Sequence, residues 1–142
     1  MHLPKYIFSE EVPETKKFLG LFLTTGWNDS YKLSETELEF AIRNSWYTYS
    51  AYNGHKLVGF GRLISDGIIH ALILDLIILP EYQNQGLGKK ILERLVDKCK
   101  EHQIRDIQLF SVKNKSEFYE KSGFTRRPEL SPGMELKWFR KD

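Results

Sequence analysis

A short loop holds the residues whose types and spacing best fit a chemical role. Gly86 and Gly88 stand between an apolar stretch that ends at Leu79 and an amphipathic pattern that starts at Leu87. When a buried strand runs through such a loop into a helix, the amides of the first helical turn stay unpaired and carry a partial positive charge. These amides can hold a phosphate, and glycines let the phosphate come close to the backbone. The loop therefore indicates a phosphate site, although a tight strand–helix connection would also need glycines.

Two common nucleotide-binding motifs do not fit this loop. Ile91 occupies the place of the third glycine of a Rossmann dinucleotide motif. Lys89 and Lys90 follow Gly88, where a Walker A loop has Lys-Ser or Lys-Thr. Lysines in a first helical turn oppose the helix dipole, so both fit better if negative charge arrives there. We therefore expect a phosphate-bearing ligand of another class.

Turn signals and apolar periodicity predict the elements that position the loop. The pairs at 53–54 (Asn-Gly) and 66–67 (Asp-Gly) are typical of tight hairpins, so the strands around them should form an antiparallel meander. Residues 34–37 have the spacing of a capping box, which starts a helix. In chain order we expect a strand at 6–9, a helix from Pro13 closed by Gly26, a loop at 27–30, a helix from 35 to about 44, strands at 46–52, 57–64 and 69–79, a helix from 87 to about 102, a strand at 104–112, a short helix at 118–119 and a final strand at 134–139. This order predicts an α+β fold with a mixed, mostly antiparallel central sheet flanked by helices.

Length and composition favour a single soluble domain over residues 1–142. Apolar residues make up 41% of the chain and charged residues 28%, as in ordinary globular proteins. The formal charge of +2 argues against nucleic acid or an anionic membrane as the main partner. The longest apolar run, at 71–79, is too short to cross a bilayer, and the N-terminus lacks the pattern of a signal peptide.

The single cysteine and the four histidines point away from disulfides and metals. Cys99 cannot form an internal disulfide and lies within a helical pattern. We therefore expect a reducing compartment, the cytoplasm, and a buried, unreactive thiol. The histidines at 2, 55, 70 and 102 show no ligand spacing, so no metal site is expected.

Two motifs carry a resemblance to a known family. Residues 83–88 (Gln-Asn-Gln-Gly-Leu-Gly) resemble the cofactor motif of the GNAT superfamily of N-acetyltransferases, a Gln or Arg followed by x-x-Gly-x-Gly or Ala. Residues 118–124 (Phe-Tyr-Glu-Lys-Ser-Gly-Phe) resemble its Phe-Tyr-x-x-x-Gly-Phe element, and residues 57–62 resemble the strand before the cofactor strand. The likeness covers roughly residues 46–127. It extends in particular to plant and cyanobacterial arylalkylamine (serotonin-type) N-acetyltransferases and their bacterial relatives.

The resemblance implies a domain of the GNAT fold with acetyl-CoA as its cofactor. The amides from Gln85 to Lys89 would then hold the pyrophosphate, and residues 76–78 would offer backbone groups to the pantetheine arm. This requires the sheet to splay open after Ile77. Asn114 lies five residues before Tyr119, which is shorter than the common family spacing. The implied cofactor-binding set is Leu76, Ile77, Ile78, Gln83, Asn84, Gln85, Gly86, Leu87, Gly88, Lys89, Asn114 and Tyr119.

The resemblance also implies catalytic roles. Tyr119 is the candidate general acid, because a phenol can protonate the thiolate that leaves; a packed tyrosine with a satisfied hydroxyl is the alternative. Asp75 lies among apolar residues, and burial would raise its pKa and suit a base that takes a proton from an ammonium substrate. It could equally brace a neighbouring loop, and direct attack with water carrying protons needs no protein base. His70 is a weaker candidate for a proton relay, and the Ile78 amide is the expected donor to the thioester oxygen.

The acceptor site is expected among aromatic residues of the first half of the chain. Trp27, Tyr31 and Phe60, together with Asp75, could hold an arylalkylamine by stacking and cation–π contact, although core packing explains most such aromatics. We therefore predict acetyl transfer to a primary amine of a small molecule, with arylalkylamines as one candidate class. A protein N-terminal or lysine acetyltransferase and a non-catalytic acyl-CoA sensor are the alternatives. The resemblance also implies a homodimer.

Overall fold

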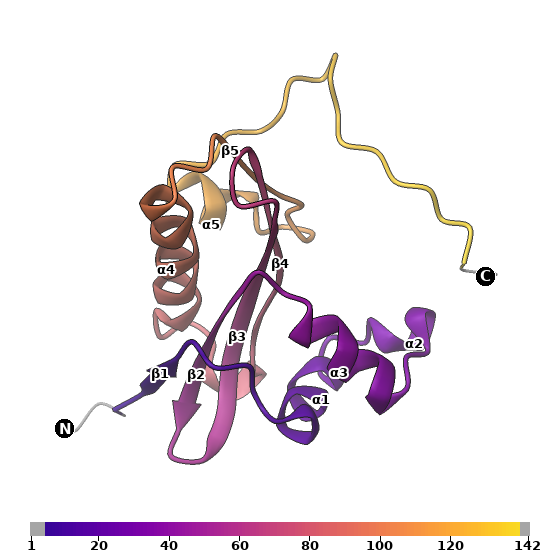
Figure 1. Ribbon diagram of the computed structural model, residues 1–142, viewed down its shortest axis with the longest axis vertical. Helices are drawn as coiled ribbons and strands as arrows, with labels where there is room; N and C mark the ends of the chain where they lie inside the picture. Colours follow the sequence, from indigo (N-terminus) through magenta and orange to yellow (C-terminus); the bar gives the residue numbers. More distant parts are fainter. Residues whose placement is uncertain (1–4, 140–142) are drawn as a thin grey trace.

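One five-stranded sheet forms the centre of the computed structural model, which describes residues 5–139 (Figure 1). The strand order follows the chain, with three antiparallel pairings and a parallel pairing between the last two strands. The expected α+β fold with a mixed, mostly antiparallel sheet is therefore confirmed. The strands are β1 (Ile7–Ser9), β2 (Tyr47–Asn53), β3 (Lys56–Ser65), β4 (His70–Ile78) and β5 (Asp106–Leu109).

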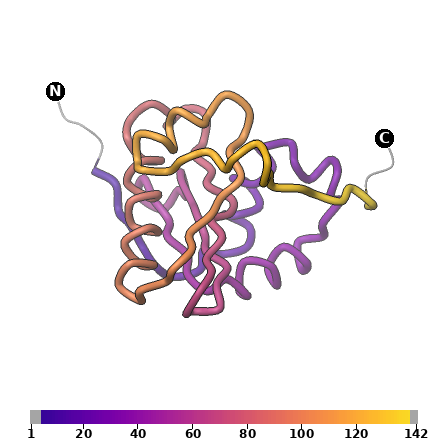
Figure 2. Tube along the Cα trace, turned by 90° about the horizontal axis from the view of Figure 1, so that it is seen from above, coloured from indigo at the N-terminus to yellow at the C-terminus, as the bar shows by residue number. Residues whose placement is uncertain are grey.

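Helices cover both faces of the sheet. On one face lies α4 (Leu87–Glu101), which packs against β2, β3 and β4. On the other face α1 (Thr15–Leu23) packs against β3, β4 and α3 (Glu35–Arg43). Figure 2 shows the strands between these two layers when the molecule is seen from above. The predicted apolar stripe of α4 is confirmed, since the helix buries Leu87, Ile91, Leu92, Leu95 and Cys99.

The turn and cap signals of the sequence are confirmed. Gly54 and Gly67 have φ of 62° and 80°, the left-handed conformation that tight turns require and that glycine adopts most easily. Ser34 and Glu37 form the complete capping box: the Glu37 amide donates to the serine hydroxyl at 3.1 Å and the Ser34 amide donates to the carboxylate at 2.9 Å. Cys99 is buried as expected, and burial raises the pKa of its thiol.

Two expected elements were wrong. Most of the loop expected at 27–30 belongs instead to the short helix α2 (Asn28–Tyr31), because the Asn28 side chain accepts from the Leu33 amide at 2.8 Å and holds the turn closed. Residues 134–139 form no strand in the structure and lie exposed, because a strand pattern specifies a conformation but does not supply a neighbouring strand. No helix within residues 5–139 is long and apolar enough to span a bilayer.

Candidate active site

The sheet opens between β4 and β5. The pairing of these strands ends at Ile73 and Leu109, whereas β4 stays paired with β3 as far as Ile78. The opening therefore begins after Ile73, not after Ile77 as the sequence led us to expect. The reason is that β5 is short: the chain leaves the sheet after Leu109 and turns toward α5 (Ser116–Glu120). Backbone groups of β4 on the β5 side are thus left without a strand neighbour over residues 74–78.

A β-bulge shapes the open part of β4. Phe60 pairs with Ile77, and Arg62 pairs with Leu74. Two residues of β4, Asp75 and Leu76, therefore lie opposite the single residue Gly61 of β3. Asp75 has a φ of 54°, which is unusual for a residue with a side chain. The bulge therefore bends β4 just after its pairing with β5 has ended.

The Asp75 carboxylate braces this bulge. It accepts a hydrogen bond from Nε of Arg62 at 2.7 Å, and the same guanidinium donates to the Ala41 carbonyl of α3 at 3.1 Å. Both side chains are mostly buried, with 14% of Arg62 and 20% of Asp75 exposed. This is the bracing role that the sequence left open as an alternative. Asp75 does not line the cavity described below, so the structure does not bring its carboxylate to the predicted acceptor site.

The backbone of Ile78 faces the gap. The next residue, Leu79, donates its amide to the Val58 carbonyl of β3 at 2.9 Å. Because successive residues of a strand point their backbone groups to opposite sides, the groups of Ile78 point away from β3. Its carbonyl accepts from Nε2 of Gln83 at 3.0 Å, which leaves the Ile78 amide as a donor toward the gap. Gln83 thus ties the loop to the end of β4.

The loop before α4 exposes backbone amides. Gly86 is the N-cap with a φ of 85°, and no side chain caps the helix. The first intrahelical bond runs from the Lys90 amide to the Gly86 carbonyl at 3.1 Å, so the preceding amides of the first turn can bind a ligand. No acidic residue lies in that turn. A Cβ at Gly88 would lie 3.4 Å from the Phe118 ring, so the start of α4 and α5 lie close together at this point.

Two glycines of β3 set the height of α4 above the sheet. A Cβ at Gly59 would lie 3.0 Å from the Ile91 side chain, and one at Gly61 would lie 2.9 Å from that of Leu95. Either methyl group would require the ends of these side chains to shift, because such contacts are shorter than van der Waals packing allows. The glycines therefore let α4 pack closely on β3.

A cavity of about 480 Å³ lies where these elements meet. It runs from the start of α4 along β4 to the turn after α1, and α5 forms one wall. Ten predicted cofactor residues and one predicted acceptor residue line it: Leu76, Ile77, Ile78, Gln83, Asn84, Gly86, Leu87, Gly88, Lys89, Tyr119 and Trp27.

Besides Asp75, four predicted site residues lie outside the cavity. Phe60 was a wrong prediction, because it is fully buried in the core with its ring centre 4.6 Å from that of Phe18. Tyr31 is 44% exposed on α2 and is not part of the cavity wall. Asn114 and Gln85 are exposed and do not line the cavity either; the Gln85 side chain accepts from the Tyr6 hydroxyl at 2.5 Å.

The cavity is also lined by seven residues that the sequence did not single out as site residues. Thr24 and Thr25 have no motif, and their hydroxyls donate to carbonyls of the last turn of α1 at 2.6 and 2.7 Å. Phe118 and Lys115 could have been found, since the first belongs to the Phe-Tyr motif and the second precedes it. The seven residues are Thr24, Thr25, Pro80, Tyr82, Val112, Lys115 and Phe118.

Tyr119 offers a protonated hydroxyl to the cavity. Its ring packs edge-on against those of Phe118 and Phe124, with ring centres 5.1 and 6.2 Å away. Burial raises the pKa of Tyr119 because the charged phenolate loses hydration. The phenol is therefore neutral at physiological pH and can donate a proton but not accept one.

The charge of the cavity wall is positive. Lys89 and Lys115 line it, and no aspartate or glutamate of the described chain does so. His70, the weaker relay candidate, is exposed and lies 3.1 Å from Asp106 at the opposite end of β4. Residues 5–139 contain no group of three or more histidine, cysteine or acidic side chains placed to hold a metal ion. The wall suits an anionic ligand with an apolar arm.

Comparisons with known proteins agree with this geometry. The family described as Acetyltransferase (GNAT) domain matches residues 24–135. An uncharacterized N-acetyltransferase, ycf52, of Pyropia yezoensis is 33% identical over 115 residues, which are 78% of this chain and 64% of that protein. Histone acetyltransferase TAP1 of Glycine max is 34% identical over 110 residues, or 70% of this chain and 48% of that one. The chain thus spans less than two thirds of the length of either relative.

A solved structure supports the same fold. A GNAT-family acetyltransferase from Streptococcus pneumoniae superposes with a TM-score of 0.76 at 25% sequence identity. The superposition covers 97% of this chain and 100% of that one.

Proposed function

The chain belongs to the GNAT acetyltransferase family, and we propose that it transfers an acetyl group from acetyl-CoA to a primary amine of a small molecule. One observation carries the proposal: the gap between β4 and β5 leads directly to the uncapped N-terminus of α4. A ligand with an amide-bearing arm and a pyrophosphate at one end fits such a cavity, and CoA is a ligand of this kind.

The residues present fit the phosphates of CoA. The amides that follow Gly86 point from the first turn of α4, where the helix dipole favours an anion. Lys89 and Lys115 add positive charge to the same wall. The shape of the cavity supports an arm of the ligand that runs along β4.

The open backbone of β4 fits the arm. Residues 74–78 have no strand neighbour on the β5 side, so the backbone groups that face that side, apart from the Ile78 carbonyl bound by Gln83, can pair with the amides of pantetheine as they would with an added strand. Leu76 and Ile77 contribute apolar side chains to the wall. An extended arm is therefore bound by the same groups that would bind a β-strand.

The chemistry needs a hydrogen-bond donor, a proton donor and a route for the amine proton. When bound, acetyl-CoA supplies an acetyl group activated as a thioester. The Ile78 amide donates to the carbonyl oxygen, where negative charge develops as the amine nitrogen forms its bond to carbon. Tyr119 donates a proton to the sulfur as the carbon–sulfur bond breaks, and water restores it. Water also takes the proton that the amine loses, since the Asp75 carboxylate is held by Arg62.

The acceptor lies at the α1 end of the cavity. Trp27 packs edge-on against Phe22 at 6.0 Å and lines the cavity beside Thr24 and Thr25. An aromatic face next to hydroxyl groups suits an aromatic amine, which supports arylalkylamines as the first class to test. Acetylation of a lysine in a protein is the second candidate, because the relative from Glycine max is named a histone acetyltransferase.

The test is release of CoA from acetyl-CoA, followed with a thiol reagent in the presence of single acceptors. Arylalkylamines, polyamines, amino acids and short lysine peptides form the panel. We expect release with arylalkylamines well above the rate without an amine. Release only with peptides would move the acceptor to proteins, and binding of acetyl-CoA without turnover on any acceptor would indicate a sensor.

A further inference from the structure

The side chain of Arg62 joins the end of α3 to the bulge of β4. Its Nε donates to the Asp75 carboxylate at 2.7 Å, and its Nη1 donates to the Ala41 carbonyl at 3.1 Å and to the Ser45 hydroxyl at 3.4 Å. The Ala41 carbonyl is open to Arg62, because the Ser45 amide donates to the Ile42 carbonyl instead, at 3.2 Å. A cation at the C-terminus of a helix is also favoured by the helix dipole. The bulge of the cofactor strand is therefore anchored on α3.

The bulge decides which amide of β4 faces the gap. Val58 directs its backbone groups toward β4, since its carbonyl accepts from the Leu79 amide at 2.9 Å. Without the extra residue of the bulge, the register would shift by one and Ile78 would lie opposite Val58 in place of Leu79. Such a shift reverses the side to which the backbone groups point, because these groups alternate along a strand. The Ile78 amide would then point to β3 and be lost from the gap.

The conformation of the bulge depends on support from its surroundings. Asp75 has a φ of 54°, which a residue with a side chain adopts only at a cost. Such conformations persist where the surrounding structure holds them in place. The Asp75–Arg62 ion pair can do this, because its side chains are mostly buried and their attraction is less screened by solvent than that of surface pairs.

We propose that Arg62 and Asp75 are positioning residues for acetyl transfer, because their ion pair holds the bulge in the register that brings the Ile78 amide to the thioester oxygen. This inference rests on the proposed function. Neither side chain lines the cavity, so both act through the backbone of β4 and not by contact with a substrate. Loss of the pair should therefore slow the reaction much more than it weakens binding of the phosphate end of CoA.

The first test compares Asp75→Asn with Asp75→Ala. Asparagine tolerates the left-handed conformation and keeps an oxygen that can accept from Arg62, whereas alanine does neither. We expect Asp75→Ala to lower kcat by about 100-fold, as for a reacting group misplaced by about 1 Å, and to change the Kd of CoA by less than about threefold. Asp75→Asn should stay within about fivefold of the unmodified kcat, the difference between a charged and a neutral hydrogen bond. Equal losses in the two variants would overturn the proposal, because a proton-accepting carboxylate predicts that pattern.

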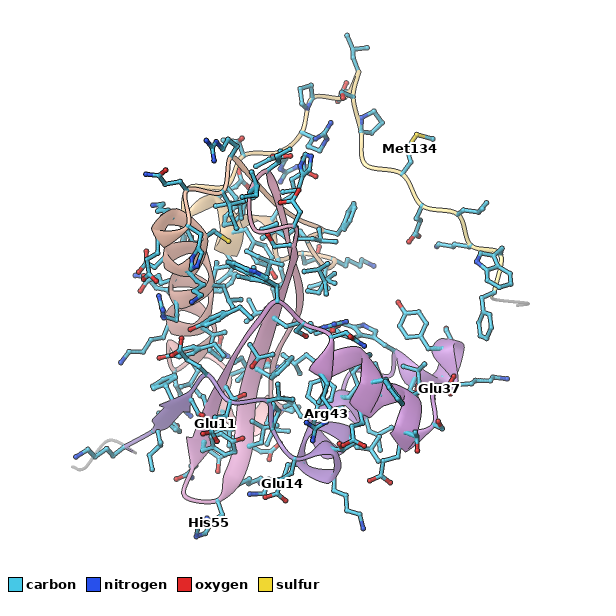
Figure 3. All side chains as sticks on the ribbon, in the orientation of Figure 1. Glu11, Glu14, Glu37, Arg43, His55 and Met134 are labelled. Atoms are coloured by element: carbon cyan, nitrogen blue, oxygen red, sulfur yellow. The ribbon has the colours of Figure 1, made fainter. Side chains whose placement is uncertain are left out.

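Glu39→Ala is the matched control on α3. Glu39 accepts from Nε of Arg43 at 3.1 Å, and the two side chains are 42% and 65% exposed. Figure 3 labels Arg43, which lies in the last turn of α3. The control thus removes an arginine–carboxylate pair from the same helix without affecting the bulge, and kcat should not change. A loss in Glu39→Ala as large as that in Asp75→Ala would contradict the proposal.

A double variant keeps the test decisive if a single variant fails to fold. Asp75→Ala and Arg62→Leu each leave a mostly buried charge without its partner, whereas the double variant leaves none. We expect the two single variants and the double variant to lose kcat to the same extent, because the two side chains act as a unit. A folded double variant with the kcat of the unmodified protein would overturn the proposal.

The last test requires no turnover. Nitrogen-15 NMR of the Ile78 amide compares the complex with CoA and the complex with acetyl-CoA, which differ only in the acetyl group. We expect the amide proton to move downfield with acetyl-CoA in the unmodified protein and in Asp75→Asn, and not in Asp75→Ala. The same shift in Asp75→Ala, or no shift in the unmodified protein, would overturn the positioning role.

The same spectra separate this inference from the proposed function. A downfield shift that depends on Asp75, in a protein that acetylates none of the amines, would refute the transfer reaction and support the positioning of the Ile78 amide. An unmodified protein that does not bind acetyl-CoA would overturn both.

Discussion

The two ends of the catalytic cavity are built from different kinds of chemical group. At the α4 end, the groups that face the ligand belong to the backbone, namely the amides after Gly86 and the open side of β4. At the α1 end they are side chains, those of Thr24, Thr25 and Trp27. Backbone groups are the same in every protein, whereas side chains differ from one relative to the next. This difference supports our proposal that the α4 end binds the cofactor and the α1 end binds the acceptor.

The largest effect is expected from a charge at the backbone end. Gly86→Glu should weaken acetyl-CoA binding by about 100-fold or more. The new carboxylate and the phosphates of CoA are both negative, and like charges placed together cost several kcal/mol. Isothermal titration calorimetry on the folded variant measures the loss. Gly54→Glu is the matched control, since Gly54 also has a positive φ but lies in the exposed β2–β3 turn. Normal CoA affinity in folded Gly86→Glu would remove the phosphate site from the loop.

A smaller effect is expected from the hydroxyl of Tyr119, which lines the same cavity. Tyr119→Phe should lower kcat by about 100-fold, in line with the loss of a general acid, and leave acetyl-CoA affinity nearly unchanged. Steady-state kinetics at saturating amine measures it. Tyr52→Phe is the control, because burial also raises the pKa of Tyr52, which does not line the cavity. An unchanged kcat in Tyr119→Phe would exclude its hydroxyl from the reaction.

A change at the side-chain end should affect the acceptor alone. Trp27→Ala should raise the KM for the amine by about tenfold, the loss of one aromatic contact with a cationic ligand, while the KM for acetyl-CoA stays the same. Phe40→Ala, at an exposed position of α3, is the control and should leave both constants unchanged. If Trp27→Ala instead weakens acetyl-CoA and spares the amine, the two ends have been assigned in reverse.

The smallest effect concerns pH. Since burial raises the pKa of Tyr119, its phenol stays protonated up to and beyond the ordinary tyrosine value of about 10. The kcat at saturating amine should therefore hold on the alkaline side until above about pH 10 and fall only there. In Tyr119→Phe this fall should be absent. A decline that begins near pH 8 and disappears in the variant would mean that the tyrosine titrates lower than its burial implies.

The same contrast explains what the sequence could predict. The capping box, the two hairpin turns and the stripe of α4 follow from local residue types, and all are confirmed. The loop at 83–88 was predictable because a backbone site requires glycines at a strand–helix junction. The role of Asp75 was harder to predict. Its ion pair with Arg62 depends on the β-bulge, which a strand pattern does not reveal.

The acceptor end was predicted less well. Phe60 and Trp27 are both aromatic, and nothing in their immediate neighbours tells that the first packs on Phe18 in the core while the second reaches the cavity. Thr24 and Thr25 approach β4 only through the packing of α1 on the sheet, across about 50 residues of chain. The tail at 134–139 likewise has a clear strand pattern, yet the structure gives it no neighbouring strand.

Hydrogen–deuterium exchange with and without ligands tests the division of the cavity most directly. Acetyl-CoA alone should protect the amides of residues 76–78 and 86–89, and leave those of residues 24–27 exchanging as before. Adding an accepted amine with CoA should then protect residues 24–27. Protection at 24–27 by acetyl-CoA alone, or no protection at 86–89 at saturating acetyl-CoA, would contradict the division and with it the proposed orientation of the two substrates.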